Sequence, residues 1–207
     1  MRGKFIVLEG IDGSGKDTQE KLLKKEFSDF VYFHVLDEEK AHTNNLRIAM
    51  FKSSYKWQTL PEMLLFWADK FEAAQEMKKL VEAGKNVICN RWEASNLAYQ
   101  LHGKGSNEES FIRMMQTKLD EVLKPDLYIL FDISSDESSK RRSMRSAQEG
   151  GNSTDNYYDQ SKKDFFDRVI LGYKQELKNY NHVVINGEQS REKVFEDTLS
   201  AINNVLK

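Results

Sequence analysis

Five short apolar runs recur along the chain, separated by longer segments with helical periodicity. The runs cover residues 5–8, 31–35, 87–89, 127–131 and 183–185. A continuous apolar run of this length is typical of a strand buried on both faces, as in a parallel sheet. The pattern therefore predicts five parallel strands.

Between these runs, apolar residues recur three and four positions apart, as they do on the buried face of a helix. Helices are predicted over residues 18–27, 62–83, 111–123, 165–177 and Arg191–Leu206. In the second of these, the predicted buried face comprises Leu65, Ala68, Phe71, Ala74, Met77 and Leu80. Gly84 and Pro125 are predicted to end helices, and Ser190 to cap the last one.

Strands that alternate with helices imply right-handed crossovers and helices on both faces of the sheet. The expected fold is therefore α/β, a three-layer arrangement around a five-stranded parallel sheet. The chain has 207 residues, which suits one domain spanning 1–207. Residues 148–155 are polar and contain two glycines, so a mobile lid is predicted over about 141–158.

Composition narrows the possible functions. Charged residues make up 31% of the chain and the net charge is −2, which argues against a protein that binds nucleic acid through a basic surface. Cys89 is the only cysteine, so a disulfide framework and a cysteine-based metal site are excluded, and a buried structural thiol is expected. No apolar run is long enough to span a membrane, and the first strand begins so early that a signal peptide is not expected. We therefore expect a cytoplasmic enzyme.

The segment between the first strand and the first helix carries the strongest chemical signal. It contains two glycines five positions apart followed by a lysine, and comprises Gly10, Ile11, Asp12, Gly13, Ser14, Gly15 and Lys16. A strand, a glycine loop and a helix point backbone N–H groups at a phosphate, and the lysine adds a charge for its β/γ oxygens. The pattern predicts a phosphate-binding loop, which GTPases, ATPases and kinases share.

The residue after the lysine departs from this pattern. A hydroxyl that ligates Mg²⁺ is usual there, whereas this chain has Asp17 followed by Thr18. A carboxylate oxygen is also a good Mg²⁺ ligand. Asp17 is thus the candidate metal ligand, although its charge could instead repel the nucleotide.

Further motifs follow in order: LLFWADK at 64–70, NRWEASNLAYQ at 90–100, PDLYILFD at 125–132, DNYY at 155–158 and FFDRVILGY at 165–173. Together with EGIDGSGKDTQ at 9–19, this series resembles the thymidylate kinase family of P-loop nucleoside monophosphate kinases. The resemblance implies a P-loop NTPase fold, ATP with Mg²⁺, a deoxypyrimidine monophosphate substrate, most plausibly dTMP, and a homodimer.

The resemblance also implies roles for single residues. Asp12 would act in catalysis and contact the 3′-hydroxyl side of the substrate sugar, and Arg91 would hold the acceptor phosphate. Phe66 would stack on the pyrimidine while Lys70, where the family usually has arginine, reaches its edge. The remaining substrate-binding candidates are Ser95, Asn96, Tyr99 and Tyr157. Of these, Asn96 would read the thymine edge and Tyr99 would exclude a 2′-hydroxyl.

The family's arginine for transition-state charge is not at either of its usual positions, in the P-loop or in the lid. Three arginines precede the lid, and we assign catalysis to Lys16 together with Arg142 and Arg145. One of these two arginines would stabilise the transition state and the other would contact ATP, and the sequence leaves open which does which. Arg141 is assigned to ATP binding. Asn90 also replaces an acidic residue of the family.

These departures keep two alternatives open. The first is a kinase of another or a modified deoxypyrimidine monophosphate, or of a deoxynucleoside. The second is a non-catalytic nucleotide-binding protein.

Overall fold

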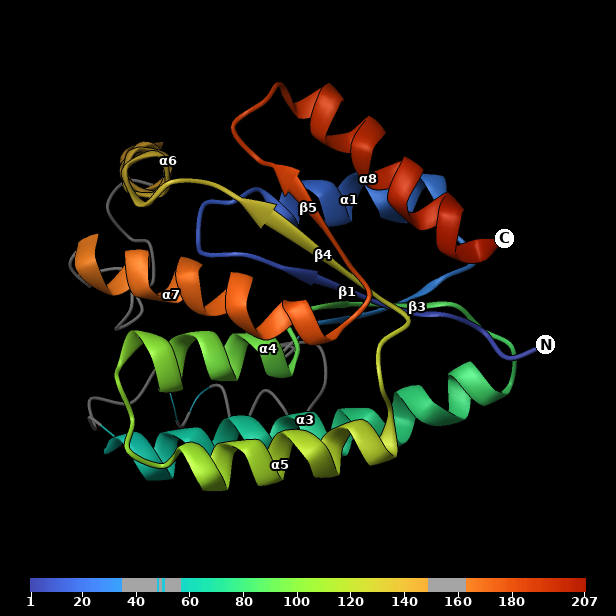
Figure 1. Cartoon of the computed structure of the whole chain (residues 1–207). Coiled ribbons are helices and arrows are strands. Elements are labelled where there is room, and N and C mark those ends of the chain that lie inside the picture. Colours follow the sequence, from blue (N-terminus) through green and yellow to red (C-terminus); the bar gives the residue numbers. More distant parts are fainter. Residues whose placement is uncertain (35–47, 49, 51–56, 149–162) are drawn as a thin grey trace.

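The structure, a computed structural model, describes residues 1–34, 48, 50, 57–148 and 163–207. Within these residues, the sheet at the centre of the molecule has five strands, all parallel. The strands are β1 (Phe5–Glu9), β2 (Val31–His34), β3 (Val87–Asn90), β4 (Leu127–Asp132) and β5 (His182–Asn186). Their order is β2-β3-β1-β4-β5, which places β1 in the middle (Figure 1).

Helices cover both faces of this sheet (Figure 1). One layer contains α1 (Lys16–Glu26) and α8 (Arg191–Leu206). The other contains α3 (Thr59–Glu82), α4 (Glu93–Asn96), α5 (Glu109–Val122) and α7 (Lys163–Glu176). The π-helix η2 (Leu97–Gly103) continues α4, the short η3 (Leu177–Asn179) continues α7, and α6 (Ser135–Gln148) follows β4. The predicted three-layer α/β fold is confirmed.

Alternation along β1 separates two hydrophobic cores. Phe5 and Val7 face the cluster that includes residues of α3, η2, α5 and α7. Ile6 and Leu8 face the cluster built with α1 and α8. All four side chains are fully buried, so β1 is anchored on both faces, and the loop that follows it starts from a fixed point.

The predicted elements agree with the structure to within a few residues at their ends. Ser190 caps α8 as expected, since its side chain accepts a hydrogen bond from the Lys193 N–H. The predicted buried face of α3 was wrong at one residue, Ala68, which is exposed. The buried stripe of α3 instead includes Met63, Trp67, Lys70, Ala74, Met77 and Val81, because Lys70 takes a core position that apolar periodicity does not mark.

Within the described residues, no helix is both long and apolar enough to cross a membrane. Residue 35 of the second predicted strand and residues 149–158 of the predicted lid lie outside the described residues, whereas 141–148 belong to α6.

A buried carboxyl group at the start of α4 links two core elements. Glu93 is fully buried and accepts a hydrogen bond from the Tyr128 hydroxyl on β4. Its second oxygen has no hydrogen-bond partner among the described residues. Burial raises the pKa of Glu93 to about 8, against the lowering effect of the Tyr128 hydrogen bond. The folded protein therefore favours the protonated acid.

The raised pKa of Glu93 predicts that the protein becomes less stable as pH rises from the pKa of Glu93 in the unfolded chain to its pKa in the folded protein. In that window the folded state holds a proton that the unfolded state has lost, so the free energy of unfolding decreases as pH rises from about 4.5 to 8. Glu93→Gln should remove this contribution, which amounts to a few kcal/mol at most because one pKa unit is about 1.4 kcal/mol. Thermal melts of both proteins at pH 5 and pH 8 test this: equal shifts in melting temperature would contradict it.

Candidate nucleotide and phosphate site

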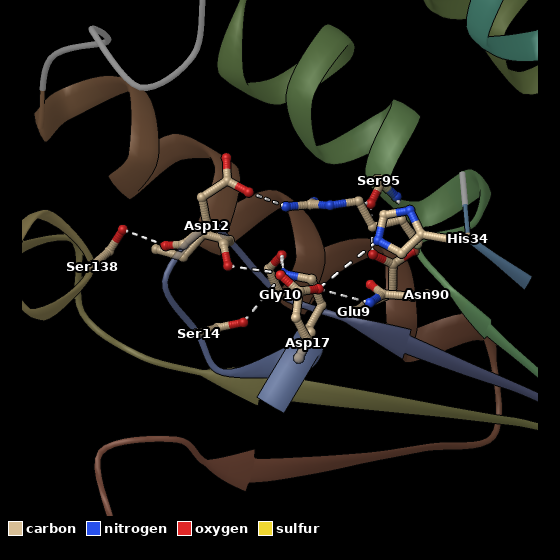
Figure 2. A network of polar contacts seen from close by, with 12 residues as sticks. Glu9, Gly10, Asp12, Ser14, Asp17, His34, Asn90, Ser95 and Ser138 are labelled. Atoms are coloured by element: carbon tan, nitrogen blue, oxygen red, sulfur yellow. Dashed lines mark hydrogen bonds and ion pairs between the residues drawn. The ribbon is translucent and has the colours of Figure 1, made fainter. Parts of the chain in front are cut away.

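The loop between β1 and α1 has the backbone that phosphate binding requires. Gly10, Gly13 and Gly15 have φ angles of 145°, 80° and 96°, in the region that favours glycine. At Gly10 a Cβ would lie 2.7 Å from both the Phe131 carbonyl oxygen and the Ser14 hydroxyl. The α6 residue Ser138 fixes the loop from outside by donating a hydrogen bond of 2.7 Å to the Asp12 carbonyl (Figure 2).

Lys16 lies inside this loop, at the first residue of α1. Its Nζ donates to the carbonyl oxygens of Gly10 at 2.7 Å and Ile11 at 3.0 Å, and to the Ser14 hydroxyl at 3.3 Å. Burial and the nearby Arg91 charge lower the pKa of Lys16 to about 8. A lysine held in this way keeps its positive charge within the glycine loop.

Glu9 connects the loop to the turn after β3. Its buried carboxylate accepts hydrogen bonds from Trp92 N at 2.8 Å, Ser95 N at 3.2 Å and Ser95 Oγ at 2.6 Å. A buried carboxylate is stable only when such donors replace water. Glu9 therefore fixes the start of α4 against the end of β1.

Arg91 occupies the turn that Glu9 holds. Its φ angle is 72°, unusual for a side-chain-bearing residue and typical of functional sites when the surroundings enforce it. The guanidinium donates to the Asp12 carboxylate, and to the Tyr173 hydroxyl at 3.3 Å. Its Cζ lies 5.4 Å from the centre of the Tyr99 ring. The predicted acceptor-phosphate residue thus faces the phosphate-binding loop.

Asp12 remains ionised in this setting. Burial raises the pKa of its carboxyl group, but the charges of Arg91, Lys16 and Arg142 outweigh burial and hold the pKa below its usual value. The side chain is still 21% exposed, so it is not closed off from a ligand. Asp12 can therefore accept a hydrogen bond from a ligand hydroxyl while it orients Arg91.

The predicted pyrimidine-binding residues come from two neighbouring helices in the same layer. Lys70 is 1% exposed, and its Nζ lies 5.7 Å from the centre of the Phe66 ring, so the two share a face of α3 as expected. Burial lowers the pKa of Lys70, although the Asp69 and Glu9 charges oppose this. Ser95, Asn96 and Tyr99 are all buried on α4 and η2, and Asn96 Nδ2 has no hydrogen-bond partner among the described residues.

Asp17 belongs to a polar cluster that the sequence did not reveal. Asn90 donates to Asp17 Oδ1 at 2.9 Å and to Glu20 Oε2 at 2.7 Å, and His34 Nε2 lies 3.9 Å from Asp17 Oδ1. The contact with His34, together with the Lys16 charge and the Asn90 amide, holds the pKa of Asp17 well below its usual range. Asp17 is thus a carboxylate beside the P-loop lysine, the position predicted for a metal ligand.

The three arginines of α6 lie in different surroundings. Arg141 donates to the carbonyl oxygens of Gly13 at 3.3 Å and Gly187 at 2.9 Å, which brings α6 against the P-loop. Arg142 is partly buried, with its Cζ 4.4 Å from the centre of the Phe166 ring, and its charge acts on Asp12. Arg145 is exposed. Tyr157, the remaining predicted substrate residue, lies outside the described residues.

Four site residues escaped the sequence analysis: Glu9, Glu20, His34 and Tyr173. His34 ends β2, and its approach to Asp17 depends on that strand ending beside β3. Glu20 lies three residues after Asp17 on α1, so helical spacing was a signal for it. Glu9 ends the central strand and Tyr173 belongs to a helix with apolar periodicity, and these patterns predict burial but not hydrogen-bond partners. For Glu9, the available signal was a charged residue at the end of a buried strand.

A glycine loop between a central parallel strand and a helix, with its lysine inside, defines the class of P-loop nucleotide-binding proteins. The comparisons with known proteins give the family. The model of the thymidylate kinase family matches residues 8–198, and the chain belongs to this family.

Relatives in other organisms match over their full length. The thymidylate kinase of Caldicellulosiruptor saccharolyticus is 32% identical over 212 residues, covering 100% of this chain and 99% of the relative. The probable thymidylate kinase of Pyrococcus abyssi is 32% identical over 225 residues, covering 100% and 98%. The thymidylate kinase of Orientia tsutsugamushi is 30% identical over 209 residues, covering 99% and 95%.

The hydrogen bonds of Glu9 predict a large effect on stability. Glu9→Ala leaves three donors of the β3–α4 segment without their acceptor. It should lower the free energy of unfolding by at least about 3 kcal/mol, because a hydrogen bond to a charged group contributes roughly 1.5–3 kcal/mol and such contributions are not fully additive. The matched control is Glu188→Ala, which removes an exposed carboxylate that also accepts from a backbone N–H and a serine hydroxyl. Urea unfolding of both variants measures the difference, and equal effects would contradict the role of Glu9.

Proposed function

We propose that this protein transfers the γ-phosphoryl group of MgATP to the 5′-phosphate of dTMP, giving dTDP and ADP. One observation carries the proposal: Arg91 faces the phosphate-binding loop across a direct contact with Asp12 of that loop. Two sites for phosphate groups thus lie next to each other. Phosphoryl transfer requires this arrangement, since donor and acceptor must approach in line.

The acceptor side is preorganised by the protein's own contacts. Asp12, Tyr173 and Tyr99 hold the Arg91 guanidinium, and Glu9 holds the turn that carries it. An arginine fixed in this way loses little freedom when it binds a phosphate through two parallel hydrogen bonds. Asp12 would contact the sugar 3′-hydroxyl with the oxygen not used by Arg91.

The base side combines an aromatic face with buried polar groups. Phe66 would stack on the pyrimidine, and Lys70 would donate to a base carbonyl oxygen from the same helix face. The amide of Asn96 offers a donor and an acceptor, which suits the N3–H and O4 edge of thymine. The buried Tyr99 ring would occupy the space of a 2′-hydroxyl and so favour deoxynucleotides.

The residues beside Lys16 fit a divalent cation. Asp17, Glu20 and His34 each offer a ligand atom, and these atoms lie within 4.8 Å of one another. Mg²⁺ bound with ATP would neutralise charge on the β- and γ-phosphates. Asp17 is the residue of this group closest in sequence to Lys16, and we assign it the metal contact.

Charge that develops on the transferred phosphoryl group needs a positive partner. Lys16 supplies one from the loop. Arg142 is the best-placed arginine of α6, because its charge already lowers the pKa of Asp12 in the loop. Arg141 contacts the P-loop backbone and would support ATP binding from there. Arg145 lies further along the exposed side of α6 and would act only after movement of that helix.

A coupled assay of ADP formation with dTMP, dUMP, dCMP and thymidine tests the proposal. Highest kcat/KM with dTMP supports it. A preference for another monophosphate would mean that Lys70 and Asn96 select a different base. Turnover of thymidine alone would indicate a nucleoside kinase, and no ADP with any acceptor would indicate a non-catalytic nucleotide-binding protein.

The position of Lys16 predicts the effect of its removal. Lys16→Ala should lower kcat by at least about 100-fold, the scale of one preorganised charge-stabilising group, while the far-UV circular dichroism is unchanged. Lys25→Ala, at the exposed last turn of the same helix, is the control and should retain wild-type activity. Turnover of Lys16→Ala within tenfold of wild type would contradict phosphate binding by this lysine.

The surroundings of the α6 arginines predict an order of effects. Arg142→Ala should lower kcat and kcat/KM together by about 100-fold, because a group that acts only in the transition state changes both equally. Arg145→Ala should have a smaller effect, and Arg141→Ala should mainly raise the KM for ATP. Steady-state kinetics with varied ATP and varied dTMP separates these outcomes, and near-wild-type kcat in Arg142→Ala would place the catalytic cation elsewhere.

A further inference from the structure

We infer that Asp17, Glu20 and His34 form a binding site for a first-row divalent transition-metal ion, which the protein holds directly and without a nucleotide. The three side chains come from the start of α1, the next turn of that helix and the end of β2. Their ligand atoms all lie within 4.8 Å of one another. The inference deepens the metal contact in the proposed function, but it can be tested without kinase activity.

The spacing of the ligand atoms suits a single ion. Metal–ligand bonds of about 2.1 Å place two ligands on opposite sides of a cation about 4.2 Å apart. All three ligand atoms lie within 4.8 Å of one another, and His34 Nε2 lies 3.9 Å from Asp17 Oδ1. Small side-chain rotations would therefore bring all three atoms to one ion.

Asn90 provides a second, independent indication. Its side chain is fully buried, and Figure 2 shows it directed at Asp17. Nδ2 donates to Asp17 and Glu20, while Oδ1 has no hydrogen-bond partner in the described part of the chain. The two carboxylate oxygens thus converge on one amide, and a half-turn of this amide would present Oδ1, a cation ligand, to the same point while Nδ2 takes the position that Oδ1 occupies.

The two lysines near Asp17 and Glu20 do not occupy the space between the three ligand side chains. Glu20 Oε1 pairs with Lys24 at 2.7 Å, and the other oxygen of Glu20 faces Asn90. The Lys16 charge lowers the pKa of Asp17, but Lys16 Nζ itself is directed into the P-loop. Asp17 is 67% exposed, so an ion can enter and water can complete its coordination.

The ligand chemistry distinguishes this site from one for Mg²⁺ alone. Mg²⁺ in phosphate-transfer sites is bound by one or two carboxylates and the substrate phosphates, and it keeps several waters. An imidazole nitrogen favours transition metals, and the carboxylates are compatible with Mn²⁺. We therefore expect Mn²⁺ to bind more tightly than Mg²⁺ when no nucleotide is present.

The test is Mn²⁺ binding to the nucleotide-free protein, measured by electron paramagnetic resonance of the free ion and by calorimetry. We expect one Mn²⁺ per chain that equimolar Mg²⁺ does not displace. Glu20→Gln and His34→Gln should each weaken binding at least about tenfold, the lower end of what losing even an outer partner of a metal site costs. Asn90→Asp, which adds a third carboxylate, should tighten it.

Matched controls are Glu26→Gln, on the exposed side of α1, and His182→Gln, on β5; both should bind Mn²⁺ as the wild type does. Failure of the wild type to bind Mn²⁺, or equal binding by Glu20→Gln, His34→Gln and the controls, would overturn the inference. The proposed function fails separately, through the substrate assay: a protein that binds Mn²⁺ and forms no ADP would keep the metal site and lose the kinase assignment.

Discussion

The buried carboxylate of Glu9 is the constraint on which the site depends. It ends the central strand, and its three hydrogen bonds hold the turn after β3. Its charge also opposes the effect of burial on the pKa of Lys16, Lys70 and Arg91, together with the larger effects of Asp12 on Lys16 and Arg91 and of Asp69 on Lys70. Glu9 is therefore one of several anions that offset the cations proposed to bind the donor phosphate, the acceptor phosphate and the base. An uncompensated charge in this setting would destabilise the fold.

The sheet topology brings these groups together. Parallel strands end at the same edge, and the order β2-β3-β1-β4-β5 sets the P-loop of β1 between the ends of β3 and β4. From β3 comes Arg91, and the chain leaving β4 enters α6, which fixes the loop through Ser138 and Arg141 (Figures 1 and 2). The loop has few side chains of its own to pack, so its conformation is held by the strand before it and by these contacts with α6.

Sequence alone was sufficient for the fold class and for locating the glycine loop. The apolar runs located the strands because a central parallel strand is buried on both faces, and the P-loop followed from glycine spacing. Lys70 shows the limit: a lysine at a core position disrupts the apolar period, so the face of α3 was misjudged at Ala68.

The cluster around Asp17 divides in the same way. Glu20 follows Asp17 by three residues on α1, so helical spacing was a signal for it that the sequence analysis did not use. His34 could not be assigned because its approach to Asp17 depends on the pairing of β2 with β3, which local pattern does not encode.

The two departures from the family pattern, Asp17 and Asn90, are in direct contact, and this changes their interpretation. Taken singly, the first adds a carboxylate beside the nucleotide and the second removes one near the metal. Together they move a carboxylate from the end of β3 to the start of α1, and the Asn90 amide donates to it at 2.9 Å. At the proposed metal position the negative charge is then retained rather than lost, which argues against loss of the proposed metal contact. The exchange also weakens the attraction of Asp17 for a cation, because the Asn90 amide competes for the same carboxylate. Glu20 and His34 offset this loss, since each offers a further ligand atom close to Asp17.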